Sequence, residues 1–332
     1  TSCGTESDNT ALRSALKAQK DRRHIITTRV EHPAVLSTCQ ALEKEGYKVT
    51  YLGVDEKGRL NLDEYRQALS SETAIVSVMW ANNETGNIYP VEKMAVMAHE
   101  HGAFFHTDAV QAVGKVPIDL RESAIDMLAL SGHKLHAPKG VGALFIRRRL
   151  PFRPFLLGGH QERGRRAGTE NTTGLIALGK ACEVALEHMD DENTRVRALR
   201  DKLEQGLLAD IPDARLNGSE PRLPNTSNIS FGYVEGEAIL LMLDQLSICA
   251  SSGSACTSGS LEPSHVLRAM GVPFTFAHGS IRFSLSRFNT EEEVDFIVEN
   301  MPRIIKNLRK LSPFNKDSGP DGFACATEGK SS

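Results

Sequence analysis

The sequence has no excess of basic residues and no long hydrophobic run. Its 39 lysines and arginines are balanced by 42 aspartates and glutamates, which gives a formal net charge of -3. Proteins that displace counterions from a phosphate backbone carry a basic excess, so nucleic acid is not expected as a main partner. The uncharged apolar stretches, such as residues 238–243, fall far short of the ~18 residues that span a bilayer, so no membrane partner is expected.

Paired cysteines are also missing. The six cysteines form no CxxC motif and have no spacing typical of metal ligands; they are Cys3, Cys39, Cys182, Cys249, Cys256 and Cys325. A chain of 332 residues is too large to need disulfides for its stability, so we expect a reducing, cytoplasmic compartment. With 40% hydrophobic and 24% charged residues, the composition also excludes the disordered and fibrous classes.

The first half of the chain has the pattern of an α/β domain. Short β-branched runs alternate with helical patterns between residues 10 and 155, which is typical of a mainly parallel sheet covered by helices. The predicted strands are residues 25–28, 48–52, 74–79, 103–106, 127–130 and 142–146. The predicted helices are residues 12–19, 61–69, with Asn61 as N-cap, and 91–99.

The second half predicts a smaller α+β domain. Residues 171–209 are almost wholly helical in pattern, and strand-like runs at 225–231, 247–250 and 280–285 then alternate with helices at 235–245, 263–270 and 290–311. The last of these helices begins with a capping box, Thr290 to Glu293. We therefore predict four parts: a large domain (1–185), a linking helix (186–209), a small domain (210–312) and a flexible tail (313–332).

Polar residues follow two of the predicted strands. Lys134 comes after the strand 127–130, in the region where open α/β sheets bind ligands. Its amine can condense with an aldehyde cofactor, although a solvated loop lysine explains the segment equally well. Asp108 also follows a strand, where a buried carboxylate needs a cation such as a protonated pyridine. A helix N-cap or a structural salt bridge is the alternative for Asp108.

The start of the chain is a run of small residues before a helical pattern. Backbone N–H groups at such a helix start point at anions, and hydroxyl groups add donors. Residues 1–7 are thus a candidate anion-binding turn. A plain N-cap explains the same run.

Taken in order, these segments resemble the aspartate-aminotransferase-like enzymes of fold type I, which use pyridoxal 5'-phosphate (PLP). Further segments resemble the class V cysteine desulfurases, and their sequences are most similar to the nitrogen-fixation type; these are residues 31–34, 81–86, 162–171, 251–258, 261–268 and 280–284. The resemblance covers residues 1 to about 312. It implies a PLP-binding large domain and a small domain that carries a catalytic cysteine.

The resemblance also implies a role for each matching residue. Lys134 would bind PLP covalently, and the rest of the cofactor would be held by Gly4, Thr5, His32, Asp108, Gln111, Ser131 and His133, with Thr169 reaching in from a second subunit. Within that set Asp108 would pair with the pyridinium, His32 would stack on the ring, and Gln111 would bond the phenolic oxygen. The substrate carboxylate would be held by Asn83 and Arg282.

Cys256 is the expected catalytic thiol. It lies among serine, glycine, alanine and threonine, a composition too small and polar for a core, so we expect an exposed, mobile loop. A buried, inert thiol is the common alternative, but it fits Cys182 and Cys249 better. The resemblance implies that Cys256 takes sulfur from the substrate as a persulfide, with His32 as a base or proton shuttle. Cys256 would ligate metal only if an iron–sulfur cluster were transiently bound.

The expected activity is therefore the conversion of L-cysteine to L-alanine by a homodimer that passes sulfur to an iron–sulfur scaffold protein for nitrogenase metallocluster assembly. Two alternatives stay open. One is a selenocysteine lyase or another PLP-dependent C–S lyase, and the other is a non-catalytic sulfur-relay or scaffold-docking protein. Family members carry a segment before the phosphate turn, whereas this sequence begins inside that turn at Thr1, so we expect a partial or truncated chain.

Overall fold

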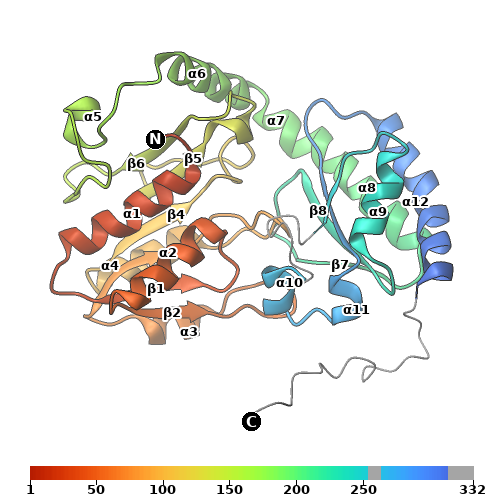
Figure 1. Cartoon of the computed structure of the whole chain (residues 1–332), viewed down its shortest axis with the longest axis horizontal. Coiled ribbons are helices and arrows are strands. Elements are labelled where there is room, and N and C mark those ends of the chain that lie inside the picture. The colour runs from red at the N-terminus through yellow and green to blue at the C-terminus, as the bar shows by residue number, and fades with distance from the viewer. Residues whose placement is uncertain (253–262, 313–332) are drawn as a thin grey trace, which may run out of the picture.

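The computed structural model describes residues 1–252 and 263–312. They form a six-stranded sheet, a four-stranded sheet and the helices that cover them (Figure 1). The predicted persulfide residue Cys256 and the predicted tail 313–332 lie outside the described residues. No helix in the described part of the chain is both long and apolar enough to cross a membrane.

The six-stranded sheet has the order β2-β1-β3-β4-β5-β6. Its strands are β1 (His24–Thr28), β2 (Lys48–Leu52), β3 (Thr73–Ser77), β4 (Phe104–Asp108), β5 (Met127–Ser131) and β6 (Gly142–Ile146). All neighbouring pairs are parallel except β5 and β6. The prediction of a mainly parallel α/β sheet is confirmed, because each predicted strand overlaps an observed one.

Helices cover both faces of this sheet (Figure 1). They are α1 (Gly4–Ala18), α2 (Pro33–Lys44), α3 (Leu62–Ala68) and α4 (Val91–Glu100). Successive strand residues point to opposite faces. Ile25 and Ile75 pack with α1 and α2, whereas Ile26 and Val76 pack with the helices of the other face. The helix α2 had no counterpart in the sequence prediction, whereas the predicted N-cap Asn61 of α3 is confirmed.

A helical stretch leads from the large sheet to the small one. It comprises α6 (Thr172–Glu187), α7 (Met189–Asp191), the π-helical turn η2 (Glu192–Val196) and α8 (Arg197–Asp210). Before it lie the turn η1 (Gly132–Leu135) and the short α5 (Gln161–Gly164). Figure 1 shows α6 above the large sheet and α8 beside the small one. The predicted helical character of 171–209 is confirmed, and the predicted domain limits stay predictions.

The four-stranded sheet has the order β7-β8-β10-β9 and is antiparallel. Its strands are β7 (Ala214–Leu216), β8 (Thr226–Phe231), β9 (Ser251–Ser252) and β10 (Ser280–Ser284), and its helices are α9 (Gly236–Asp244), α10 (His265–Ala269), α11 (Phe274–Ala277) and α12 (Glu291–Leu311). The capping box of α12 is confirmed. The strand predicted at 247–250 is wrong: Ser247 lies in the turn after α9 with a positive φ of 58°, and strand pairing begins only at β9.

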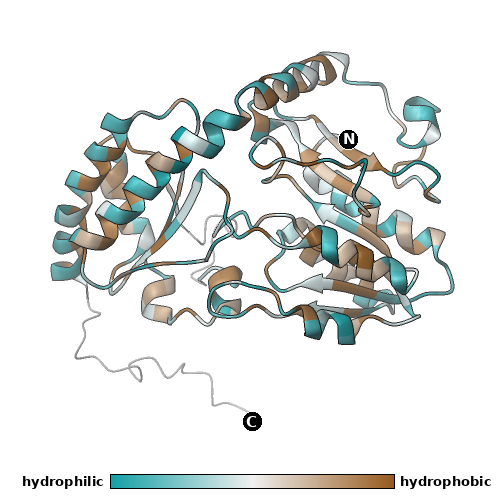
Figure 2. Cartoon of the chain, turned by 180° about the vertical axis from the view of Figure 1, so that it is seen from behind, coloured by the Kyte–Doolittle hydropathy of each residue, from teal (hydrophilic) through white to brown (hydrophobic). Residues whose placement is uncertain are grey.

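One face of the small sheet carries the hydrophobic core of this part. Ile229, Phe231 and Ile281 pack against α8, α9 and α12. The alternating residues Asn228 and Arg282 therefore lie on the other face. Their side chains bond backbone carbonyls of residues 83–84, which follow β3 of the large sheet. Figure 2 shows brown, hydrophobic residues in the sheets and more teal on the outer helices. The polar face of β8 and β10 thus borders the functional site.

Candidate active site

A cavity of about 300 Å³ lies where the parallel strands of the large sheet end and the polar face of the small sheet begins. It is lined by Cys3, Gly4, Thr5, Asp8, His32, Met79, Ala81, Asn83, Asp108, Val110, Gln111, Ser131, His133, Lys134 and Arg282. Of the predicted site residues that the structure describes, all except Thr169 are in this set. Residues spread over most of the chain therefore meet in one place.

The sheet topology explains why these side chains meet. The parallel strands β1, β3, β4 and β5 end at the same edge, and the chain after each one contributes to the cavity. Asp108 is the last residue of β4, and Lys134 lies in η1 directly after β5. The predicted placement of both residues at strand ends is confirmed.

One end of the cavity is built for an anion. The helix α1 starts at Gly4, and the residue before it, Cys3, makes no side-chain cap, so N–H groups of the first turn are left for a ligand. A Cβ atom at Gly4 would lie 2.8 Å from Val110 Cγ2, so a side chain would crowd the cradle. Ser131 Oγ and His133 Nδ1 are 3.0 Å apart and add polar atoms. This donor set suits a phosphate group.

Two buried carboxyl groups line the cavity. Asp108 accepts a hydrogen bond of 2.9 Å from the Val110 N–H. Burial raises the pKa of Asp108 to about 6, against the opposing effects of that hydrogen bond and of the Lys134 charge. Burial and the neighbouring charges of Asp108 and Glu31 raise the pKa of Asp8 well above its ordinary value. Of the two carboxyl groups, Asp8 is therefore the one that favours the protonated form, and Asp108 is the one suited to carry the negative charge at this cavity.

His32 lies at the cavity as the N-cap of α2. Its Nδ1 accepts a hydrogen bond of 3.1 Å from the Ala34 N–H, which leaves the proton of the neutral ring on Nε2. Burial, the Lys134 charge and the His265 charge lower the pKa of His32. His32 is thus both the N-cap of α2 and part of the cavity lining.

Asn83 and Arg282 come from the two sheets and touch. Arg282 Nη1 donates a hydrogen bond of 2.9 Å to the Asn83 carbonyl. The side-chain atoms Asn83 Oδ1 and Arg282 Nε are buried, and neither has a hydrogen-bond partner among the described residues. Buried polar atoms of this kind are normally satisfied, so they mark a place for a polar ligand. A guanidinium there suits a carboxylate.

The structure separates Thr169 from these residues. In this chain Thr169 lines a different cavity of about 70 Å³, beside Ser2 and Arg166. Arg166 bonds both carboxylate oxygens of Glu6, at 2.9 and 3.1 Å, and so ties the loop of Thr169 to the first turns of α1. The role of Thr169 toward a partner's cofactor stays a prediction.

Sequence reasoning missed some lining residues and misplaced two cysteines. Asp8 could have been found, because it follows Gly4 by four positions and so lies on the same helix face. The expectation of buried thiols at Cys182 and Cys249 is wrong, since both are exposed, and Cys39 is the buried one. Within residues 1–252 and 263–312, no group of three histidine, cysteine or acidic side chains could hold a metal ion.

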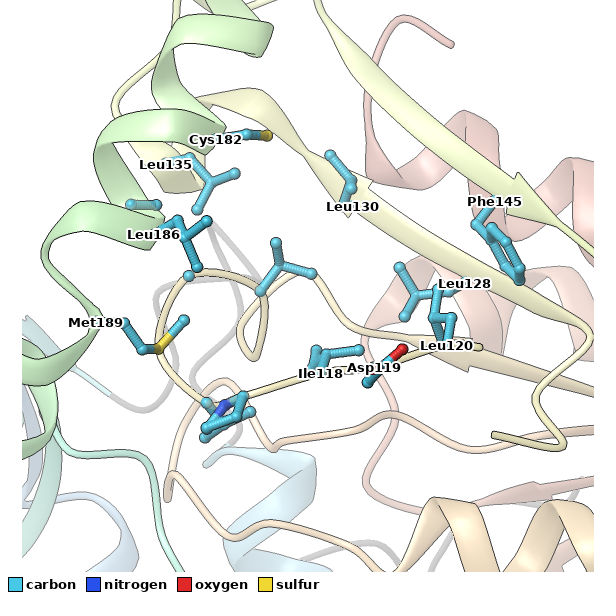
Figure 3. Close-up of a pocket in the computed structure, with 15 residues that line it drawn as sticks. Ile118, Asp119, Leu120, Leu128, Leu130, Leu135, Phe145, Cys182, Leu186 and Met189 are labelled. Carbon is cyan, nitrogen blue, oxygen red and sulfur yellow. The ribbon is translucent and has the colours of Figure 1, made fainter. Parts of the chain in front are cut away.

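A second and larger cavity, of about 660 Å³, lies between α6 and the segment 113–120 (Figure 3). It is lined almost entirely by apolar side chains, including Leu130, Leu135, Leu186 and Met189. Asp119 and Cys182 are the titratable groups among its described lining residues. The cavity offers no set of acids and bases for catalysis, so the smaller, polar cavity is the candidate active site.

Comparison with known proteins points the same way. Residues 1–297 match the family Aminotransferase class-V. The chain is 63% identical to a cysteine desulfurase of Gluconacetobacter diazotrophicus over 99% of this chain and 82% of that protein. It is also 63% identical to the cysteine desulfurase NifS of Azotobacter vinelandii, over 96% of this chain and 80% of that protein.

Solved structures show the same fold. The structure of a NifS-like protein superposes with a TM-score of 0.86 at 39% identity and covers 93% of this chain and 82% of its own. The structure described as SspA in complex with cysteine has a TM-score of 0.75 at 33% identity, with coverage of 87% and 81%. The predicted fold, with its large and small sheets, is thus found in proteins of known structure.

Proposed function

The chain belongs to the class V aminotransferase family and is a cysteine desulfurase, and from this premise we propose that it uses PLP to convert L-cysteine to L-alanine, with Cys256 as sulfur acceptor. The relatives do not favour the selenocysteine lyase, C–S lyase or non-catalytic alternatives. The observation that carries the proposal is that one cavity joins Lys134, Asp108, the anion cradle of α1 and Arg282.

The residues of this cavity fit PLP. The start of α1 with Thr5, Ser131 and His133 would hold the phosphate, and Asp108 would pair with the ring nitrogen. His32 would stack on the ring, and Gln111 would bond the phenolic oxygen. PLP, when bound, supplies an electron sink for the charge left at the substrate α-carbon. The neutral state of Asp8 leaves the carboxylate of Asp108 free to keep the ring nitrogen protonated.

The chain's own groups then position the substrate and move its protons. Arg282 and Asn83 would hold the α-carboxylate with the atoms that the structure leaves unpartnered. Lys134 Nζ would be the base for the α-proton. His32 is held neutral by burial, and its Nε2 is suited to carry a proton between the substrate thiol and the product carbon.

The sulfur step is a transfer between thiols. The Cys256 thiolate attacks the substrate sulfur, an S–S bond forms, and the C–S bond breaks with its electron pair going to carbon. Protonation of that carbon gives alanine, and the persulfide stays on Cys256. We infer a homodimer that passes this sulfur to an iron–sulfur scaffold in nitrogenase metallocluster assembly, in line with the nitrogen-fixation name of one relative. The thiol chemistry requires a reducing compartment such as the cytoplasm.

The test is alanine formation from L-cysteine, with PLP and a thiol reductant, for the parent chain, Cys256→Ala and Cys182→Ala. Cys182 is exposed but lies outside the polar cavity, so it is a matched control for loss of a thiol. We expect the parent and Cys182→Ala to form alanine at equal rates and Cys256→Ala to lose it at least a hundredfold.

Alanine formation by Cys256→Ala would mean a lyase without a persulfide on that thiol. If the parent forms no alanine and shows no absorbance band of bound PLP, although circular dichroism shows it folded, the non-catalytic relay would be the better explanation. The same assay on purified protein therefore separates the three functions.

A further inference from the structure

The two described ends that flank residues 253–262 lie on the same small group of polar side chains. On one side, Ser251 and Ser252 form β9 and pair with Arg282 and Ile281 of β10. Cys256 follows Ser252 by four residues, and four extended residues reach at most ~14 Å. The proposed sulfur acceptor is therefore connected by a short stretch of chain to the strand that presents Arg282.

On the other side, Ser264 is bonded to Glu84. Both residues are only 4% exposed, and the Ser264 hydroxyl donates a hydrogen bond to Glu84 Oε2. The same Ser264 oxygen accepts the N–H groups of Val266 and Leu267, at 3.1 and 3.4 Å. Its single proton is thus directed at the carboxyl group of Glu84, which accepts it. A link across 180 positions of the sequence holds the start of α10.

Glu84 also interacts electrostatically with Arg282. Burial raises the pKa of Glu84, whereas the hydrogen bond from Ser264 and the charges of His265 and Arg282 act in the opposite direction. Glu84 directly follows Asn83, whose carbonyl accepts the bond from Arg282. The acid is therefore the sequence neighbour of Asn83, the residue to which Arg282 is bonded.

His265 adds a second attachment of α10 to the cavity wall. Its Nε2 donates a hydrogen bond of 2.9 Å to the carbonyl of Glu31, the residue before His32. The start of α10 is thus fixed to two cavity segments, one through Glu84 and one through Glu31. A helix cap alone would need neither contact.

We propose that Glu84 and Ser264 are positioning residues that couple recognition of the substrate carboxylate at Arg282 to the start of α10, the described element that follows Cys256 in the sequence. The inference rests on the proposed roles of Arg282 and Cys256 and deepens them. Without the Glu84–Ser264 bond, the carboxylate site and the start of α10 lose their direct connection. The cofactor contacts of α1, Asp108 and Lys134 involve neither residue.

The test separates the step that needs Cys256 from one that does not. Alanine formation from L-cysteine requires sulfur transfer, whereas exchange of the α-proton of L-alanine with deuterated water requires only PLP, Lys134 and the carboxylate site. Both rates are measured for Ser264→Ala, Glu84→Met and the double variant, together with PLP absorbance. Asn61→Ala is the matched control, because Asn61 caps α3 through two N–H groups but is exposed and outside the cavity.

We expect kcat for alanine formation to fall about tenfold or more in each single variant, while proton exchange stays within about twofold. The double variant should lose no more than either single one, because all three lack the same bond. Asn61→Ala should keep both rates. Equal losses in both reactions, or additive losses in the double variant, would overturn the inference and leave a purely structural role. Alanine formation by Cys256→Ala would overturn the proposed function itself.

Discussion

The carboxyl group of Glu31 gives a pH-dependent prediction that can be worked out from the structure. Glu31 is fully buried, both of its carboxylate oxygens lie 3.0 Å from the Met79 nitrogen, and Oε1 accepts a bond of 2.8 Å from the Thr28 hydroxyl. Burial raises its pKa from 4.5 to about 8, these bonds oppose the shift, and the charge of Asp108 adds to it. Glu31→Gln keeps the shape and removes the titration.

The sign follows from comparing the folded and unfolded chains. Below the unfolded pKa of 4.5 both states hold the proton, so Glu31 adds no pH dependence. Between pH 4.5 and about 8 the folded chain keeps a proton that the unfolded chain has lost, so the free energy of unfolding falls as pH rises. At about 1.4 kcal/mol per pH unit, the fall from pH 5 to pH 7 is about 2.5 kcal/mol.

The assay is urea unfolding followed by circular dichroism at pH 5 and pH 7 for the parent and Glu31→Gln. The variant should gain about 2.5 kcal/mol relative to the parent between these two pH values. The neighbouring acids Asp8 and Asp108 titrate in both proteins, and because they interact with Glu31, the difference reports the loss of the Glu31 proton together with this interaction. The control variant Glu92→Gln, at an exposed position, should show the same change in the free energy of unfolding between pH 5 and pH 7 as the parent. If the free energies of unfolding of the parent and of Glu31→Gln differ by the same amount at pH 5 and pH 7, the reasoning is refuted.

Two further variants test the carboxylate site and the buried ion pair between Arg222 and Glu204. Arg282→Lys loses the planar fork that binds a carboxylate through two hydrogen bonds, so KM for L-cysteine should rise about tenfold or more in initial-rate assays; a change below about twofold would contradict that role. Glu204→Gln removes the carboxylate that the Arg222 guanidinium, which is 4% exposed, bonds at 2.7 and 2.9 Å, and leaves it the longer contact of 3.5 Å with Glu220. It should lower the free energy of unfolding in urea by about 3–5 kcal/mol, and a loss below about 1 kcal/mol would show that the pair is dispensable.

The sequence was most informative where local pattern and chemistry coincide. The β-branched runs place the strands, because a strand buried on both faces needs apolar residues throughout. Polar residues directly after such runs, Asp108 and Lys134, then fall at the edge where ligands bind. The capping residues Asn61 and Thr290 could also be predicted from the sequence, because a cap depends on only a few neighbours along the chain.

The features that sequence could not provide depend on contacts between distant segments. Cys182 lies in a helical pattern, but which side of α6 faces the interior is decided by the elements around it, and the thiol is exposed. Glu84 belongs to a motif recognised in the sequence, yet its partner Ser264 is 180 residues away. The burial of Glu31, and with it the shift of its pKa, likewise requires the folded sheet.

The spread of the cavity residues along the chain has a consequence for synthesis on the ribosome. The phosphate cradle at Gly4 is synthesised long before Arg282 of β10, which follows it by 278 residues. A nascent chain can therefore form much of the large sheet well before it can complete the place for the substrate carboxylate. Cofactor that binds early would occupy an incomplete site. Tight binding of the amino acid, rather than of the cofactor, therefore reports that translation has passed β10 and that both sheets are packed together.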